Sequence, residues 1–180
     1  MKSKIWFLIV LWCVWGFIFG HLVYGANNDD TATQTISKDD YGGKVIKLVC
    51  TADSDGGAFS QAVDSTRMDQ VRGHFLYEVH AYRTTSGTAP TDASDVTIRD
   101  QNYNFLCGSE DDGTTAYAGV DVIDATENQV GVFVPNMYSH RAGEHFTHYY
   151  HIDPDMTLTV TVLNNSVNSA NFTIELKFIR

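Results

Sequence analysis

Near its C-terminus the chain reads Thr157-Leu158-Thr159-Val160-Thr161-Val162-Leu163. Leucine and valine alternate with threonine, and a period of two places the apolar side chains on one face of a β-strand. The alternation returns at residues 172–178, where the apolar members are Phe172, Ile174, Leu176 and Phe178. Residues 164–170 are rich in turn formers, so we expect these two strands to form a C-terminal hairpin.

Further strands are predicted upstream, at residues 44–50, 73–82, 94–99 and 129–134. In the second of these, one face is expected to carry Phe75, Tyr77, Val79 and Ala81. Turn-rich connectors separate the strands, residues 120–127 are ambiguous, and helical periodicity is nearly absent. Because each strand has one apolar face to bury, the sequence predicts an all-β fold with a single antiparallel β-sandwich or jelly-roll-like domain.

The first 25 residues form a separate segment. Lys2 and Lys4 precede an apolar run at residues 5–19, and small residues including Gly25 stand just before Ala26. This is the pattern of a signal peptide, so we expect export and cleavage before Ala26.

A retained membrane anchor is the alternative for this segment, because residues 5–24 are long and apolar enough to span a bilayer as a hydrophobic helix. The predicted organisation is therefore a signal peptide or anchor at residues 1–25, a flexible lead-in with a first short strand at residues 26–43, and the β-sandwich domain at residues 44–180. The expected location is extracellular, periplasmic or on a virion surface.

The chain is acidic, with a net charge of −10 that becomes −12 when residues 1–25 and their two lysines are removed. Such a chain repels phosphates and anionic lipids, so no nucleic acid partner is expected, and no membrane contact beyond residues 5–24. Cleavage also removes Cys13 and leaves Cys50 and Cys107. An even pair in an oxidising compartment predicts a disulfide, with two buried free thiols as the alternative.

Three motifs in residues 44–180 carry a resemblance to a known group. They are the turn at residues 51–59, the segment Thr88-Ala89-Pro90-Thr91-Asp92-Ala93-Ser94-Asp95-Val96-Thr97-Ile98-Arg99-Asp100, and the terminal strands ending in Phe178-Ile179-Arg180. In these the chain resembles small β-sandwich structural proteins encoded among tailed-phage virion genes. The resemblance implies a role in assembly, with protein partners or a homo-oligomer, and it supplies no catalytic residues.

The densest histidine cluster lies in residues 140–151, where the candidate metal ligands are His145, His148 and His151. On a strand His148 would point away from the other two, and on a helix the three would spread around the axis, so only a loop could bring them together. No H-E-x-x-H motif is present. We therefore expect an exposed loop at residues 144–151 without a bound metal, and a metal-dependent enzyme is the alternative.

Two other groups could form binding sites. Tyr138, Tyr149 and Tyr150 are candidates for an aromatic platform in a surface adhesin or carbohydrate-binding module. The fragments at residues 53–56 and 110–113 resemble parts of calcium loops but lack the full ligand spacing, so Asx-type turns are expected there.

The motifs of serine hydrolases, P-loop proteins and dinucleotide enzymes do not occur in the sequence. The sequence therefore predicts a non-enzymatic structural protein without a cofactor, exported or membrane-tethered, which assembles with itself or with other virion or surface proteins. The adhesin or carbohydrate-binding module and the metal-dependent enzyme are the two alternative functions.

Overall fold

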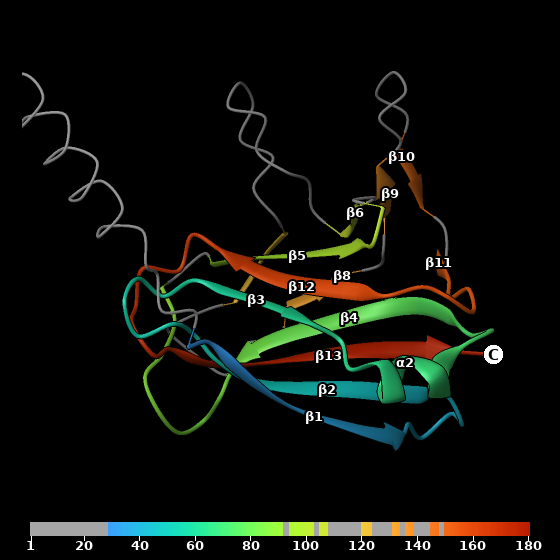
Figure 1. Cartoon of the computed structure of the whole chain (residues 1–180), viewed down its shortest axis with the longest axis horizontal. Helices are drawn as coiled ribbons and strands as arrows, with labels where there is room; N and C mark the ends of the chain where they lie inside the picture. Colours follow the sequence, from blue (N-terminus) through green and yellow to red (C-terminus); the bar gives the residue numbers. More distant parts are fainter. Residues whose placement is uncertain are drawn as a thin grey trace, which may run out of the picture.

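The structure is a computed structural model that describes residues 29–91, 94–102, 105–107, 120–123, 131–133, 136–138, 145–147 and 150–180. These residues form two facing sheets of antiparallel strands and one short helix (Figure 1). The predicted all-β sandwich is confirmed.

Sheet A has the strand order β1-β2-β13-β4-β11, and β8 also pairs with β4. Its strands are β1 (Thr31–Lys38), β2 (Lys44–Thr51), β13 (Asn171–Ile179), β4 (Phe75–Arg83), β11 (Tyr150–His151) and β8 (Gly131–Phe133). The last strand, β13, lies between β2 and β4 and pairs with both over nearly its whole length.

Sheet B has the strand order β3-β12-β5-β6, and β7 also pairs with β5. Its strands are β3 (Phe59–Ala62), β12 (Leu158–Leu163), β5 (Ser94–Asp100), β6 (Phe105–Cys107) and β7 (Val120–Ile123). A separate two-stranded sheet joins β9 (Asn136–Tyr138) to β10 (His145–Thr147).

The hydrophobic core fills the space between sheets A and B. Its largest fully buried side chains are Phe59, Phe172, Phe178, Ile46, Leu48, Met68, Leu76, Ile98, Leu106, Ile152 and Leu158. Phe59 from sheet B meets Phe172 from sheet A edge to face, with ring centroids 5.1 Å apart. The alternating pattern of each strand therefore buries one face, and this burial is the main force that holds the layers together.

One side of the sandwich is closed by side chains that connect β1 to β3. The amide of Ser60 donates to Asp30 Oδ2 (2.8 Å), and Gln61 Nε2 donates to the Asp30 carbonyl (2.9 Å). Further along, Gln34 Nε2 donates to the Ala62 carbonyl (2.9 Å). These bonds satisfy backbone groups at two sheet edges, which otherwise could pair with another chain.

The helix α2 (Ser65–Val71) continues this closed side. Asp64 caps its N-terminus by accepting from the Thr66 amide (2.7 Å), and Met68 and Val71 enter the core. This helix was not predicted from the sequence, because seven residues with two buried positions give almost no helical periodicity.

The predicted lead-in and first short strand at residues 26–43 contain β1 in their described part. Asp29 already accepts from the amide (2.8 Å) and hydroxyl (2.6 Å) of Ser54, and β1 then forms an eight-residue strand. Ala32 and Ile36 of β1 pack against the core. The predicted signal peptide or anchor lies outside the described residues. Among the described residues, no helix has the length and apolarity to cross a membrane.

The predicted C-terminal hairpin is wrong. β12 pairs with β3 and β5 in sheet B, whereas β13 pairs with β2 and β4 in sheet A. Residues 164–170 carry the chain from one layer to the other, with Asn164 (φ 58°) and Ser169 (φ 54°) in the left-handed region. The two apolar faces therefore oppose each other across the core. We call this connection the arch.

The predicted inner face of β4 is also corrected. Leu76, Val79 and Ala81 are fully buried, while Phe75 is 37% exposed. The register with β13 shifts at Lys177/Phe178, so Tyr77 and Glu78 are both on the outer side. A β-bulge reverses the faces of a strand on its two sides, and period-two reasoning does not foresee it.

The segment at residues 144–151, predicted as an exposed loop, contains two short strands in its described part. β10 pairs with β9, and β11 pairs with β4. The predicted strand at residues 129–134 is described as β8, and the ambiguous residues 120–127 include β7.

Candidate functional site

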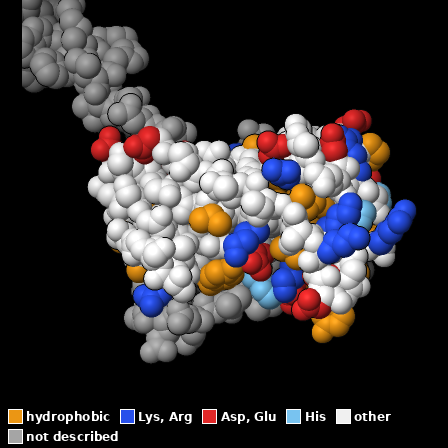
Figure 2. Space-filling view, turned by 90° about the horizontal axis from the view of Figure 1, so that it is seen from below, with side chains coloured by type: hydrophobic (Ala, Val, Ile, Leu, Met, Phe, Trp, Pro, Cys, Tyr) orange, Lys and Arg blue, Asp and Glu red, His pale blue; other side chains and the backbone are white. Residues whose placement is uncertain are grey.

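The outer face of sheet A is the solvent-facing side of the layer in or next to which the exposed large hydrophobic side chains described are found. We define this outer face by the side chains that point away from the core, which are Val45, Lys47, Val49, Tyr77, Glu78, His80, Tyr82, Thr173, Glu175 and Lys177. Exposed large hydrophobic side chains are found at Tyr41 (94%), Val49 (39%) and Phe75 (37%), all in or next to sheet A. Figure 2 shows this side of the molecule, where basic, acidic and hydrophobic side chains lie close together.

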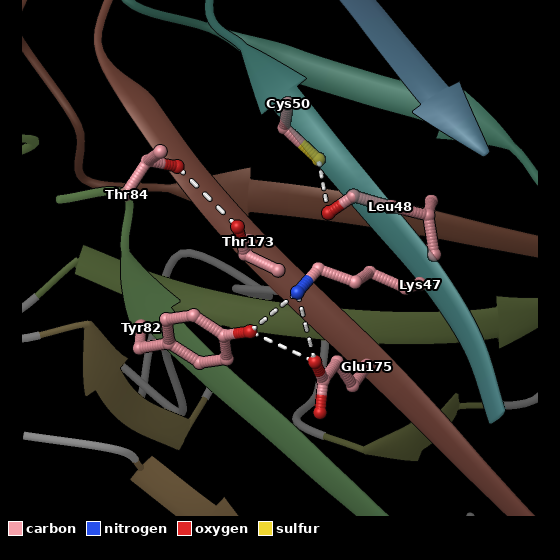
Figure 3. A network of polar contacts seen from close by, with 7 residues as sticks. All are labelled: Lys47, Leu48, Cys50, Tyr82, Thr84, Thr173 and Glu175. Atoms are coloured by element: carbon pink, nitrogen blue, oxygen red, sulfur yellow. Dashed lines mark hydrogen bonds and ion pairs between the residues drawn. The ribbon is translucent and has the colours of Figure 1, made fainter. Parts of the chain in front are cut away.

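A polar cluster on this face joins three neighbouring strands. Lys47 on β2 donates to the Tyr82 hydroxyl (3.1 Å), and that hydroxyl donates to Glu175 Oε1 (2.8 Å). Lys47 Nζ also lies 3.3 Å from Glu175 Oε1 and 5.7 Å from the centre of the Tyr82 ring. Figure 3 shows the three side chains converging over β13.

The electrostatics of this cluster follow from its contacts. The hydrogen bond with Tyr82 raises the pKa of Lys47, and the carboxylate of Glu175 adds to that shift. Burial raises the pKa of Tyr82, with a further contribution from Glu175. Both groups therefore keep their protons at neutral pH, and the cluster is a fixed set of donors and acceptors.

A second cluster lies one row closer to the end of β13. Lys177 Nζ is 3.0 Å from Glu78 Oε2, and His80 Nε2 is 2.9 Å from the same oxygen. Burial alone would raise the pKa of Glu78, but the hydrogen bond from Lys177 and the charge of His80 outweigh it, and the net shift is downward. Glu78 is therefore ionised well into the acidic range.

The β1–β2 turn, residues 39–43, presents the most exposed aromatic ring described. Asp39 Oδ1 accepts from the amides of Tyr41 (3.0 Å) and Gly43 (2.6 Å), and Gly42 has a φ of 83°. The Tyr77 hydroxyl reaches Asp39 Oδ2 from β4 (3.4 Å). Asp39 thus fixes the turn that carries Tyr41. We call this end of sheet A, with residues 39–43, Phe75 and Ile179, the turn end.

The opposite end of the sandwich, the arch end, consists of the arch and residues 53–58 and 84–91. Asn165 is 8% exposed, and its side chain donates to the carbonyls of Gly57 (2.7 Å) and Val167 (3.2 Å). It accepts from the Thr91 amide (3.0 Å), the Thr91 hydroxyl (3.3 Å) and the Val167 amide (3.2 Å). Three loops are therefore held by one amide group.

The Asx-type turn predicted at residues 53–56 is confirmed, because Asp53 Oδ1 accepts from the Asp55 amide. The second fragment, at residues 110–113, lies outside the described residues. Within the described residues, no group of three or more histidine, cysteine or acidic side chains is placed to hold a metal ion.

The three candidate metal ligands are not brought together by any described contact. His151 Nδ1 lies 2.9 Å from Asp153 Oδ1, and its ring meets Phe75 with centroids 5.0 Å apart. His145 is on β10 and its side chain is not described, while His148 lies outside the described residues.

The three tyrosines of the candidate aromatic platform are also not brought together by any described contact. The Tyr150 hydroxyl donates to Asp100 Oδ2 (3.0 Å), and burial followed by this bond raises the pKa of Tyr150. The ring is half-buried and packs against the core, so it is engaged internally. Tyr138 is on β9 without a described side chain, and Tyr149 lies outside the described residues.

The predicted Cys50–Cys107 disulfide is not formed in this structure, because Cys50 is a buried free thiol. Its Sγ donates to the Leu48 carbonyl (3.6 Å; Figure 3), and burial raises the pKa of the thiol. Cys50 lies on β2 of sheet A, while Cys107 lies on β6 of sheet B.

Sequence reasoning missed the outer face of sheet A and the turn end. Period-two alternation at residues 172–178 did place Glu175 and Lys177 opposite the apolar face. The strand order brings Lys47 and Tyr82 to either side of Glu175. The alternation of apolar and polar residues does not predict this order. The only local signal for Tyr41 is its position between two aspartates and two glycines, which is typical of a tight turn.

No family model matches the chain, and no curated protein matches it. A solved structure with some likeness is the C-terminal family 22 carbohydrate binding module of Clostridium thermocellum Xyn10B. It is 17% identical, the match covers 86% of this chain and 87% of that chain, and the TM-score is 0.24. A TM-score this low carries no argument about the function of this chain.

Proposed function

We propose that the protein is a non-enzymatic structural β-sandwich, exported or membrane-tethered, which assembles with other proteins of a virion or a cell surface. The observation that carries this proposal is Tyr41, which is 94% exposed on a turn braced by Asp39. Tyrosine is among the residues that most often anchor protein interfaces. A rigid turn lowers the entropy cost of ordering such an anchor on binding.

The position of the turn within the fold supports this role. β1 enters the sandwich at the arch end, next to Asp29, and runs eight residues to the turn end, a distance of about 26 Å. A tether at residues 1–25 would therefore join the domain at the arch end. Tyr41 would then face away from the tether, toward neighbouring proteins.

The closed side of the sandwich argues against assembly by pairing of β1 with another strand. Asp30 and Gln34 bond to the backbone of β3, and Arg67 Nη2 donates to the Gln34 carbonyl (3.3 Å). These bonds occupy edge groups that an added strand would need. Contacts through side chains at the turn end are the better route.

The sequence resemblance to tailed-phage structural proteins supports a virion as the setting. The proposed partners are other structural proteins or further copies of this chain, and the proposed location is extracellular, periplasmic or on the virion surface.

The test is to purify the native particle or surface fraction and to place a photo-reactive amino acid at position 41. Covalent products at fixed stoichiometry are expected from position 41. The matched control is position 33, where Thr33 is also exposed on β1 but lies near the arch end. A protein found only as a free monomer, or equal cross-linking from both positions, would refute the proposal.

A further inference from the structure

The centre of the outer face of sheet A is charged and electrically balanced. Two lysines, Lys47 and Lys177, are paired with two glutamates, Glu175 and Glu78. The exposed hydrophobic side chains Val49 and Phe75 lie toward the two ends of the sheet. Protein interfaces have the opposite arrangement, an apolar centre depleted of charges with a polar rim. This face therefore fits a ligand with many hydroxyl groups better than it fits another protein.

Two tyrosines of β4 extend from opposite parts of this face across β13. The Tyr82 hydroxyl reaches Glu175 on β13 and Lys47 on β2, and the Tyr77 hydroxyl reaches Asp39 beyond β13. Tyr82 lies opposite Thr173, and Tyr77 lies at the bulge beside Lys177. They are thus four to five residues apart along β13, or about 15 Å. A sugar ring is roughly as wide as the ~5 Å strand spacing, so the two tyrosines are about three sugar units apart.

Glu175 and Glu78 lie between these tyrosines, and each makes its side-chain contacts through one carboxylate oxygen. Glu175 Oε1 takes both Tyr82 and Lys47, and Glu78 Oε2 takes both Lys177 and His80. The contacts given for these two glutamates leave Glu175 Oε2 and Glu78 Oε1 outside them, and Figure 3 draws Glu175 Oε2 without a contact to the other residues shown. A carboxylate oxygen of this kind accepts hydrogen bonds from hydroxyl groups. Both side chains are held in place by their lysines, so these acceptors are pre-positioned.

We propose that the outer face of sheet A binds a neutral, linear polysaccharide that runs along β13 and β4. The apolar C–H faces of the sugar rings would stack on Tyr77 and Tyr82, and their hydroxyls would donate to Glu175 and Glu78. This surface is distinct from Tyr41 and does not depend on the assembly role.

Charge selects a neutral polymer over an anionic one. The two lysines of the face are already matched by two glutamates, and the whole chain carries a net charge of −10. An anionic polysaccharide would meet an overall repulsive field and no unpaired cation among these four groups.

Affinity gel electrophoresis and calorimetry test this proposal with the full domain. The probes are hydroxyethylcellulose, mixed-linkage glucan, galactomannan and arabinoxylan, with alginate as the anionic comparison. We expect at least one neutral polymer to bind and alginate not to bind. Tyr77→Ala and Tyr82→Ala should each weaken binding by about tenfold or more, because each removes a stacking surface. Tyr82→Phe keeps the ring and should keep most of the affinity.

The controls are Tyr41→Ala and Tyr150→Phe, which alter tyrosines outside the face and should leave polysaccharide binding unchanged. Thermal unfolding of every variant separates lost binding from lost folding. The proposal is overturned if none of the four neutral polymers binds, if alginate binds as well as they do, or if Tyr77→Ala and Tyr82→Ala variants that fold bind normally. If these variants lose binding to a protein partner and not to a polysaccharide, the face is a protein interface, and the proposal is also overturned.

Discussion

The arch end and the turn end of this sandwich use polar side chains for opposite purposes. At the arch end, Asn165 is 8% exposed, and its amide group bonds to Gly57 and Thr91 of two other loops as well as to Val167 of its own. At the turn end, Asp39 makes similar bonds within its own turn, but their result is to present Tyr41 at 94% exposure. The same chemistry thus closes one end of the molecule and exposes an aromatic ring at the other.

The difference shows how stability and binding can be separated in one small domain. Removal of a polar side chain at the arch end leaves buried polar atoms without partners, which lowers the free energy of unfolding. Removal of the solvent-exposed Tyr41 side chain should leave the free energy of unfolding almost unchanged. Mutations at the two ends should therefore affect different measurements.

The largest effect is expected at the arch end for Asn165→Ala. The variant removes all five hydrogen bonds of the side chain and leaves the Gly57 carbonyl and the Thr91 amide without their partner. We expect a loss of about 3 kcal/mol in the free energy of unfolding, measured by urea denaturation. Asn168→Ala, an exposed asparagine in the same arch, is the control and should change stability by less than about 0.5 kcal/mol.

Gly57→Ala should have the next largest effect. Gly57 has a φ of 73°, and a Cβ there would lie 2.8 Å from the backbone oxygens of Asn165 and Val167. Because backbone atoms must move, we expect destabilisation of about 2 kcal/mol. At the neighbouring Gly56 an added Cβ meets nothing within 4 Å, so Gly56→Ala should be nearly neutral. Equal melting temperatures for the two variants would contradict this account of the arch end.

A smaller, pH-dependent effect is expected on the outer face of sheet A, near the turn end. Against the opposing effect of burial, the hydrogen bond from Lys177 holds the pKa of Glu78 below that of an ordinary glutamate, so its ion pairs contribute stability when the pH is above the ordinary value. This contribution is lost as the pH falls through the folded-state pKa. The Glu78 side chain is 27% exposed, so we expect well under 1 kcal/mol.

The measurement compares the wild type with Glu78→Gln at pH 6 and pH 3. The wild type should be more stable at pH 6, and the difference should shrink at pH 3. A difference that stays constant between the two pH values would show that the ionised form of Glu78 contributes nothing.

The smallest effect on stability is expected for Tyr41→Ala, below about 0.5 kcal/mol, because the ring has almost no contacts to lose. Assembly into particles should nevertheless be lost. Asp39→Ala sharpens the comparison, since it removes the bonds that brace the turn while it leaves Tyr41 in place. Asp39→Ala should weaken assembly only partly and should lower the melting temperature slightly. If the Tyr41→Ala variant still assembles fully, the turn end does not have the proposed role.

The sequence was a good guide to strands and a poor guide to their partners. Alternation correctly identified β12 and β13, because each strand has one buried face whichever sheet it joins. It could not distinguish a hairpin from an arch, since both arrangements bury the same side chains. The choice depends on backbone conformations at Asn164 and Ser169, which asparagine and serine adopt without leaving a regular pattern.

The candidate sites were less predictable than the fold. Tyr77 was expected in the core, and only the bulge in β4 moves it to the outer face. The paired clusters around Glu175 and Glu78 depend on β13 lying between β2 and β4, an order set by contacts far apart in the chain. By contrast, the Asx turn at Asp53 was predicted correctly because its hydrogen bond is made within two residues.

The central position of β13 also sets the time at which this protein can fold. β13 follows β2 and β4 in the chain by about 90 residues or more, yet β2 and β4 meet in sheet A only through it. Until residues 171–179 have left the ribosome, sheet A lacks its middle and the core lacks Phe172, Ile174, Leu176 and Phe178. Sheet A therefore cannot be completed before residues 171–179 are available.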